Sequence, residues 1–113
     1  MIKLNGKQYE CPSKIPMDLV DDKWKFLILW NLSTKPLRIS ELSEKIPDTS
    51  QRTLSRKLKA LEEVSLVRRE VFAEVPPKVE YSLTIHAQRL VEIFATMTKW
   101  GEQYAKDMGA TIS

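Results

Sequence analysis

Cysteine, histidine and glycine are scarce in this sequence of 113 residues, and their scarcity excludes several kinds of functional site. One cysteine, Cys11, cannot form an intrachain disulfide, and with one histidine, His86, it supplies too few ligands for a cysteine–histidine zinc site. The chain shows no arrangement for nucleophilic catalysis, and three glycines are too few for a phosphate-binding loop. We therefore expect no enzyme activity, no metal and no cofactor.

Long apolar runs are also absent. Lys23 and Lys25 interrupt the most apolar segment, so we expect no membrane span. The polar start MIKLNGKQYECPSK lacks the apolar core of a signal peptide. With 42% apolar and 29% charged residues, the composition suits one globular domain over residues 1–113. These features predict a cytoplasmic protein.

Positive charge is concentrated in one segment. The whole chain has a net charge of +3 and a pI near 9.0. Residues 50–69 contain six lysines or arginines and two glutamates, a net charge of +4, so the rest of the chain is close to neutral. Local basicity of this kind indicates a polyanionic partner.

The spacing of apolar residues predicts a mainly α protein with a two-stranded β hairpin. Residues 1–16 are a loosely patterned arm and residues 17–64 a helical core, in which Pro47 lies in the turn between its last two helices. Alternation predicts strands at 67–75 and 79–83, joined by a stiff loop with Lys78 at its tip. Two helices, a turn and such a hairpin (67–83) form a winged helix-turn-helix, which a long helix at 84–108 completes.

The helix after Pro47, within TSQRTLSRKLKALEEV, has two contrasting faces. Leu54, Leu58 and Leu61 fall within about 60° of one another and are expected to anchor it to the core. Cations lie near its N-terminus and acids near its C-terminus, against the helix dipole. A helix face exposed only to water is not stabilised by this order of charges. A DNA phosphate backbone near the N-terminus makes the order favourable, because the cations and the helix dipole then attract it together. The face opposite the leucines carries Gln51, Arg52, Ser55, Arg56 and Lys59, types that read base edges or hold phosphate.

The segments DDKWKFLILWNL, ISELSEKIPDTSQRTLSRKLKALEEVSLV and EVPPKVEYSLT resemble the HxlR-type winged helix-turn-helix transcriptional regulators of bacteria. The resemblance implies a homodimer on pseudo-palindromic double-stranded operator DNA, terminal helices forming the dimer interface and, in some members, a sensing cysteine. Asp21, Asp22, Ser65 and Ala87 stand where such sequences usually carry glycine. Ser65 must then be left-handed, or its helix must end differently. By position, the resemblance implies DNA contacts by Ser50, Gln51, Arg52, Ser55, Arg56, Lys59 and Lys78.

Several assignments have a plainer alternative. Arg38 and Ser40 are candidates for phosphate contact, but Ser40 equally suits capping its own helix. Lys78 is a candidate DNA contact or a charge that keeps the hairpin soluble. An effector pocket is one interpretation of Trp24, Trp30 and Trp100, and ordinary core is the other.

The closing helix and the lone cysteine raise two further hypotheses. The apolar stripe of the helix is too long for a small domain to cover, which predicts a dimer interface; the alternative is that it folds back on its own core. Cys11 precedes Pro12, a residue suited to the first position of a helix, whose N-terminus lowers a thiol's pKa. Cys11 is therefore a candidate redox or electrophile sensor, or else a small apolar residue that docks the arm. The stripe comprises Leu90, Ile93, Phe94, Met97, Trp100 and Tyr104.

Together these features predict a sequence-specific DNA-binding transcriptional regulator, dimeric, acting as a repressor or a dual regulator, with a small-molecule or electrophile effector. The alternative is a winged helix that serves only as a protein interaction module. Its basic face argues against that alternative, because protein interfaces are depleted in lysine.

Overall fold

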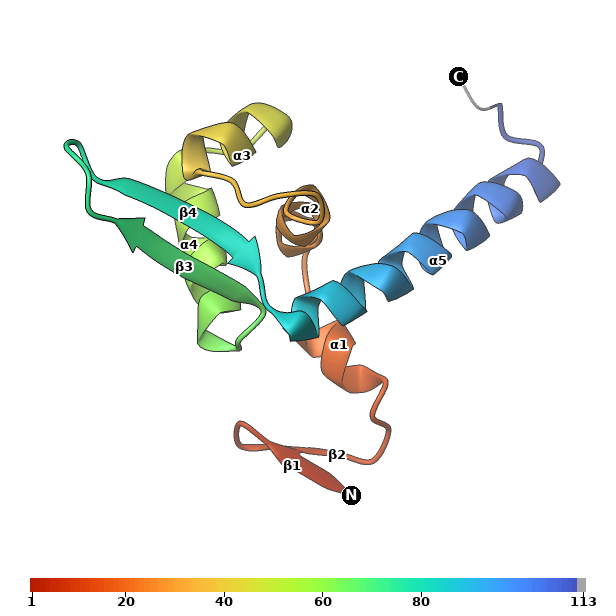
Figure 1. Ribbon diagram of the computed structural model, residues 1–113. Coiled ribbons are helices and arrows are strands. Elements are labelled where there is room, and N and C mark those ends of the chain that lie inside the picture. Colours follow the sequence, from red (N-terminus) through yellow and green to blue (C-terminus); the bar gives the residue numbers. More distant parts are fainter. Residues whose placement is uncertain (112–113) are drawn as a thin grey trace.

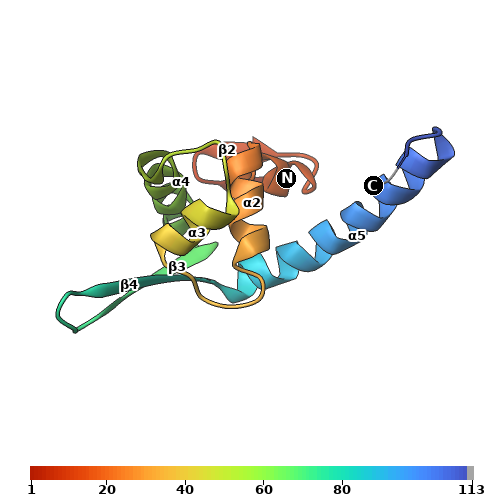
Figure 2. The ribbon, with the colours of Figure 1, turned by 90° about the horizontal axis from the view of Figure 1, so that it is seen from above.

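The computed structural model describes residues 1–111, in which three helices and a hairpin form a body from which a long helix projects (Figures 1 and 2). The helix-turn-helix and the following hairpin confirm the expected winged helix architecture. The elements are β1 (Ile2–Leu4), β2 (Lys7–Tyr9), α1 (Lys14–Leu19), α2 (Lys23–Asn31), α3 (Ile39–Lys45), α4 (Gln51–Glu63), β3 (Val67–Phe72), β4 (Lys78–Leu83) and α5 (Ile85–Asp107).

The core lies where α2, α3 and α4 meet. Ile28 and Leu29 from α2 and Leu42 from α3 are fully buried, and Leu54 and Leu58 from α4 are buried beside them. Burying each of these side chains is favourable by about 1.5–3 kcal/mol. The leucine face of α4 is therefore held inward as expected, and the opposite face is turned to solvent.

The β3–β4 hairpin is attached to this body at its root. Leu37, in the loop before α3, pairs with Tyr81 of β4: each backbone N–H donates to the other's carbonyl, at 3.0 and 2.8 Å. The predicted half-buried alternation was wrong for the far half of the hairpin. β3 ends at Phe72 rather than at residue 75, and Val71 and Val75 are 54% and 102% exposed, because no second layer covers them.

The predicted loose arm at 1–16 was wrong. Residues 2–9 form the β1–β2 hairpin, which turns at Asn5 and Gly6 with φ of 49° and 79°. An Asn-Gly pair favours this tight turn, because both central residues need positive φ. The next helix, α1, begins at Lys14 rather than near Met17. Pro16 lies in its first turn, where the missing N–H costs no hydrogen bond.

Ser65 ends the α4 segment in the left-handed conformation, with φ of 61°, which is the first of the two alternatives that the sequence left open. The Leu66 N–H donates to the Leu61 carbonyl at 2.9 Å, and the Ser65 N–H donates to the Glu62 carbonyl at 3.0 Å. These are the two bonds of a Schellman motif, in which glycine is usual at the left-handed position. Serine adopts it at a cost of about 1–2 kcal/mol.

The long helix α5 is covered only near its start. Leu90 and Phe94 join the core, where the Phe94 and Phe26 rings lie 4.8 Å apart. The alternative that α5 folds back on its own core thus holds for these two positions. Figure 2 shows the rest of α5 extending away from the body. None of the helices within residues 1–111 combines the length and apolarity needed to cross a membrane.

Candidate nucleic-acid interface

The outer face of α4 is a continuous exposed surface of polar and basic side chains. Gln51, Arg52, Ser55, Arg56 and Lys59 are all exposed, while the leucines of the same helix are buried. Within residues 1–111, Arg52, Arg56 and Lys59 form no ion pair. Their charge is therefore available to an external anion. We name this surface, formed by these five residues, the α4 outer face.

Lys57 belongs to the same helix but is directed elsewhere. Its ammonium lies 2.8 Å from a carboxylate oxygen of Asp22, and both side chains are about 70% covered, with 30% and 27% exposed. Asp22 also accepts a hydrogen bond from the Lys25 N–H at 2.8 Å, which caps α2. Partial burial raises the pKa of Asp22, but the hydrogen bonds from Lys57 and Lys25 outweigh it and the net pKa is lowered.

Ser50, Arg38 and Ser40, the other candidate DNA contacts outside the wing, differ in the structural roles that they already fill. Ser50 is the N-cap of α4, and its hydroxyl oxygen accepts from the Thr53 N–H at 3.1 Å, so a capping role is already filled. At the start of α3 the Glu41 carboxylate accepts from the Arg38 N–H at 2.8 Å. Ser40, one residue into α3, is not its cap, so that alternative is wrong. Arg38 and Ser40 both remain exposed.

Arg69 joins the same surface and was missing from the residues singled out by sequence. Ser55, Lys59 and Glu62 of α4 line one hollow together with Arg69 of β3 and Tyr81 of β4. Arg69 is exposed, and its strand runs beside α4. Its charge was visible in the basic segment, but strand periodicity alone does not place a side chain beside a helix.

Lys78 occupies a different position from the one predicted. It is the first residue of β4, opposite Phe72 in the strand register, and the turn of the hairpin lies beyond it at 73–77. Its ammonium lies 3.4 Å from a Glu80 carboxylate oxygen and 5.1 Å from the centre of the Phe72 ring. The tip of the hairpin therefore carries Val75 and prolines, whereas Lys78 lies within β4 and is paired with Glu80.

Cys11 is exposed and lies three residues before Lys14, the first residue of α1. Its sulfur lies 2.9 Å from the Ser13 hydroxyl oxygen, and the pKa of the thiol is lowered, first by this side-chain hydrogen bond and then by the Ser13 backbone, with a smaller contribution from Lys14. The expected cause was partly wrong. Pro12 is not the first residue of α1, which starts at Lys14 after Ser13.

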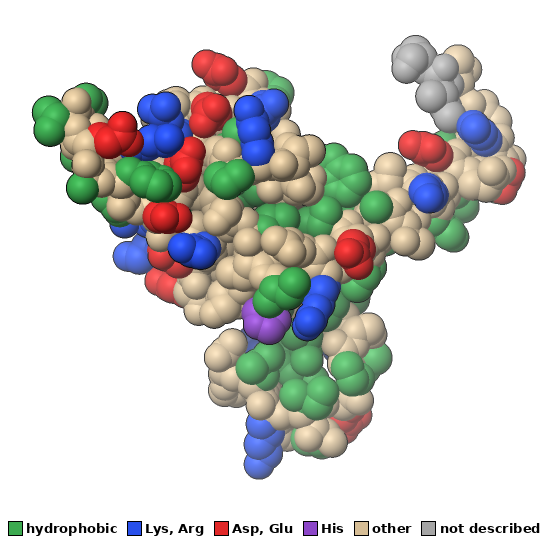
Figure 3. All heavy atoms as spheres, viewed as in Figure 1, with side chains coloured by type: hydrophobic (Ala, Val, Ile, Leu, Met, Phe, Trp, Pro, Cys, Tyr) green, Lys and Arg blue, Asp and Glu red, His purple; other side chains and the backbone are tan. Residues whose placement is uncertain are grey.

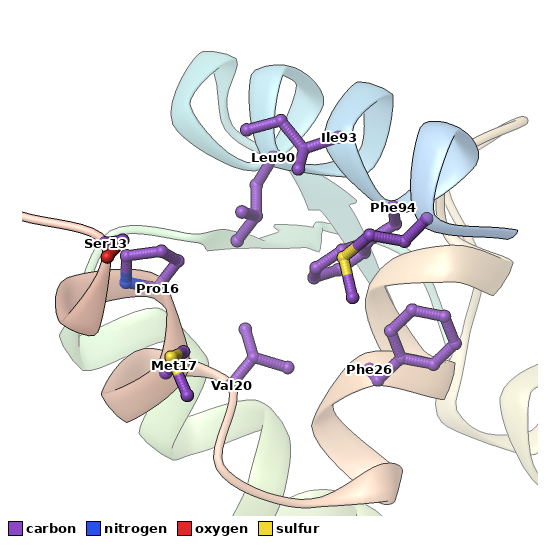
Figure 4. Close-up of a pocket in the computed structure, with 9 residues that line it drawn as sticks. Ser13, Pro16, Met17, Val20, Phe26, Leu90, Ile93 and Phe94 are labelled. Carbon is purple, nitrogen blue, oxygen red and sulfur yellow. The ribbon is translucent and has the colours of Figure 1, made fainter. Parts of the chain in front are cut away.

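A groove about 330 Å³ in volume opens between α1, α2 and the root of α5 (Figure 4). Its lining is apolar apart from Ser13 and contains none of the three tryptophans, so this cavity does not match the effector pocket that was one of two interpretations of them. Trp30 stacks on Phe26 instead, and Trp100 stacks on Tyr104. In the view of Figure 3, apolar side chains gather around and below the histidine and a basic side chain where α1 meets α5.

The part of the chain that the structure describes holds no group of three or more His, Cys, Asp or Glu side chains suited to a metal ion.

Comparison with known proteins identifies the same architecture. The family model of the HxlR-like helix-turn-helix matches residues 19–108. A helix-turn-helix transcriptional regulator of Methanothermobacter thermautotrophicus is 39% identical over 101 residues, which cover 89% of this chain and 77% of that protein. A MarR-family regulator from Enterococcus faecalis V583 superposes with a TM-score of 0.81 at 28% identity, over 95% of this chain and 97% of that one. The reduced form of YodB from Bacillus subtilis superposes with a TM-score of 0.77 at 35% identity, over 88% and 98%.

Proposed function

The chain belongs to the HxlR-like helix-turn-helix family of transcriptional regulators, and from this premise we propose that it represses genes in the cytoplasm by binding pseudo-palindromic operator DNA as a homodimer. The α4 outer face is the surface that enters the major groove. One observation carries the proposal: three cations on this face are exposed and unpaired within residues 1–111, while the fourth cation of α4 is paired with Asp22.

Residue types on the α4 outer face suit two separate tasks. Arg52 and Arg56 offer bidentate donors that match the acceptors of guanine, and Gln51 matches adenine. Lys59, nearer the C-terminal end of α4, and Arg69 on the neighbouring strand suit phosphate, and contacts to phosphate position the protein without reading sequence. Cations at the N-terminal end of α4 oppose its dipole, and an approaching phosphate backbone turns that cost into a favourable interaction.

Exposed apolar surface supports the homodimer. Beyond the core, α5 carries Ile93, Met97, Trp100 and Tyr104, which are 56%, 59%, 68% and 52% exposed. A contiguous apolar patch of this kind is typical of an association surface. In a two-fold dimer, each recognition helix reads one half-site, and the half-sites lie about 34–36 Å apart.

Response to oxidants or electrophiles is a second element of the proposal. Cys11 is exposed and its lowered pKa increases the thiolate fraction at neutral pH, which favours attack on an electrophile. Reduced YodB is among the structures this chain resembles. Because Cys11 has no second cysteine in its own chain, the products are an adduct, a mixed disulfide with a small thiol, or a Cys11–Cys11 bridge between subunits.

The first test is selection of bound sequences from a random duplex library, followed by affinity measurements on the selected operator. We expect Arg52→Ala and Arg56→Ala to weaken binding by about 1–3 kcal/mol each and to relax base preference at one position per half-site. A protein interaction module, the competing function, predicts no enrichment of any sequence and no steep fall of affinity with salt. Unchanged affinity in both arginine variants would refute the placement of α4.

The sensor is tested separately by measuring operator affinity before and after treatment with diamide or a quinone. The native chain should lose or change affinity, and Cys11→Ser should not respond. A response that persists in Cys11→Ser, or no response in either protein, removes the sensor from the proposal and leaves DNA binding in place.

A further inference from the structure

A smaller cleft, about 230 Å³ in volume, lies beside the larger groove and uses a different face of α1. Two exposed polar side chains of α5, His86 and Arg89, belong to its lining. The covered part of the lining is aliphatic and comes from three separate segments, with Ile15 and Leu19 in α1, Leu66 after α4 and Leu90 in α5. We call this site the Leu66 cleft.

The Leu66 cleft combines this aliphatic lining with an unpaired cation. None of the described residues that line it is acidic, and Arg89 forms no ion pair within residues 1–111, although Glu92 lies three residues further along α5. His86 lies on the same side of the helix as Arg89 and adds a ring N–H donor. Figure 3 shows the histidine and a basic side chain with apolar side chains around and below them. Charge complementarity therefore favours an occupant that is anionic at one end and apolar at the other.

The size of the Leu66 cleft and its lining narrow the ligand class. At roughly 30 Å³ per molecule its volume corresponds to about eight waters, which leaves room for one ring or a short branched chain. Among the described lining residues there is no Phe, Tyr or Trp, so the apolar body meets aliphatic side chains. A guanidinium holds a carboxylate through two parallel N–H donors and balances its single charge, whereas a phosphate ester carries about −1.5 to −2.

The larger groove does not suit the same ligand. Its described lining contains no charged side chain, and its one polar member is Ser13. A carboxylate placed there would lose its hydration without gaining a cation, which is unfavourable. A small acid should therefore distinguish the two cavities.

The Leu66 cleft also lies at the joint between α4 and α5. Leu66 is 3% exposed and follows Ser65, which ends the α4 segment. Thr84, the N-cap of α5, holds both residues: its N–H donates to the Leu66 carbonyl at 3.1 Å, and its hydroxyl donates to the Ser65 carbonyl at 2.6 Å. A ligand that contacts Leu66 and Arg89 thus contacts both sides of this joint.

We infer that the Leu66 cleft binds a small aliphatic carboxylic acid, with its carboxylate on Arg89 and His86 and its apolar body against Leu66, and that this acid changes the affinity for operator DNA. The binding site stands independently of the proposed function, and the effect on the operator rests on it. Because coupling between two ligands is reciprocal, operator DNA then changes the affinity for the acid by the same factor.

Amide ¹H–¹⁵N spectra of the full chain, titrated with cyclohexanecarboxylate, test the site. The amides of Leu19 and Leu66 should shift, and those of Phe26 and Met97 in the larger groove should not. Cyclohexanecarboxamide has the same shape without the charge and should bind roughly 10-fold more weakly. Absence of shifts at Leu19 and Leu66, or equal affinity for the acid and the amide, overturns the inference.

A matched pair of variants tests the role of Arg89. Arg89→Gln should weaken binding of the acid by roughly 10-fold and leave binding of the carboxamide unchanged. Lys99→Gln removes another exposed cation of α5, ten residues further along the helix, and should leave both affinities unchanged. Equal losses in the two variants mean that the acid responds only to the overall charge of the protein, and they overturn the inference.

Operator affinity in the presence of saturating acid tests the coupling. The native chain should change its affinity by about 5-fold or more, and Arg89→Gln should show no change at the same acid concentration. Operator binding that is insensitive to bound acid overturns the coupling through Leu66. A protein that binds the acid at Leu66 but enriches no DNA sequence overturns the proposed function and leaves the binding site in place.

Discussion

Lys57 and Lys59 provide a matched test of the α4 outer face, because they share a helix and a charge but differ in surroundings. Lys59 is exposed and lines the hollow with Ser55, whereas Lys57 is paired with Asp22 at 2.8 Å and is mostly covered. We expect Lys59→Ala to change DNA binding without changing stability. We expect Lys57→Ala to do the reverse.

The magnitudes follow from what each ammonium contacts. A lysine that neutralises one phosphate contributes about 0.9 to the slope of log affinity against log salt. The factor by which Lys59→Ala weakens DNA binding relative to the native chain should therefore be about 3.5-fold smaller at 200 mM salt than at 50 mM. Removing Lys57 breaks a partly covered, hydrogen-bonded ion pair, which should lower the free energy of unfolding by about 1 kcal/mol.

Two assays decide the comparison. Fluorescence anisotropy on the selected operator over a salt series gives the slope, and urea unfolding followed by circular dichroism gives stability. The reasoning is refuted if Lys57→Ala flattens the salt slope as much as Lys59→Ala does, because Lys57 would then reach phosphate instead of Asp22. Equal losses of stability in the two variants contradict the ion pair.

Three further predictions follow from particular contacts. Ending the chain after Lys99 removes Trp100 and Tyr104 but keeps the α5 residues of the core, so sedimentation should show a folded monomer with weakened operator binding; a persisting dimer places the interface elsewhere. Ser65→Gly should raise the free energy of unfolding by about 1 kcal/mol in urea, because glycine adopts the left-handed conformation freely, and should leave DNA affinity unchanged. The lowered pKa of Asp22 stabilises the fold above its ordinary value of 3.8, and this contribution is lost as the pH falls through the still lower folded pKa. Asp22→Asn should therefore be less stable than the native chain at pH 7 and equal to it once the carboxylate is protonated; a difference that does not vary with pH contradicts this.

Local patterns in the sequence were sufficient for the winged helix itself. The buried face of α4 repeats at helical spacing, and the serine at its N-cap and the left-handed Ser65 at its end are set by hydrogen bonds within a few residues. Features of that range depend on neighbours along the chain, so they are visible without the fold. The Asn5-Gly6 turn of the first hairpin is equally local, but its strands have only three residues each, too few to show an alternating pattern in the sequence.

Amphipathic spacing likewise determined which side of α4 faces outward and that α5 carries more apolar surface than one small domain covers. A helix with leucines on one side must turn its other side to solvent, wherever the core lies. The sequence therefore identified the exposed cations of α4 and the unpaired end of α5. It left open what each of these surfaces contacts.

Only the tertiary structure decided the contacts between distant segments. Asp22 meets Lys57 across 35 positions, Leu37 pairs with Tyr81, and Arg69 comes beside Lys59. The same packing buries Phe94 and brings Met17 to face the root of α5. Each of these depends on the angle and distance at which whole elements pack, which no window of sequence contains. Charge and periodicity thus specified the kind of surface, and packing alone determined which of its residues are paired, buried or exposed.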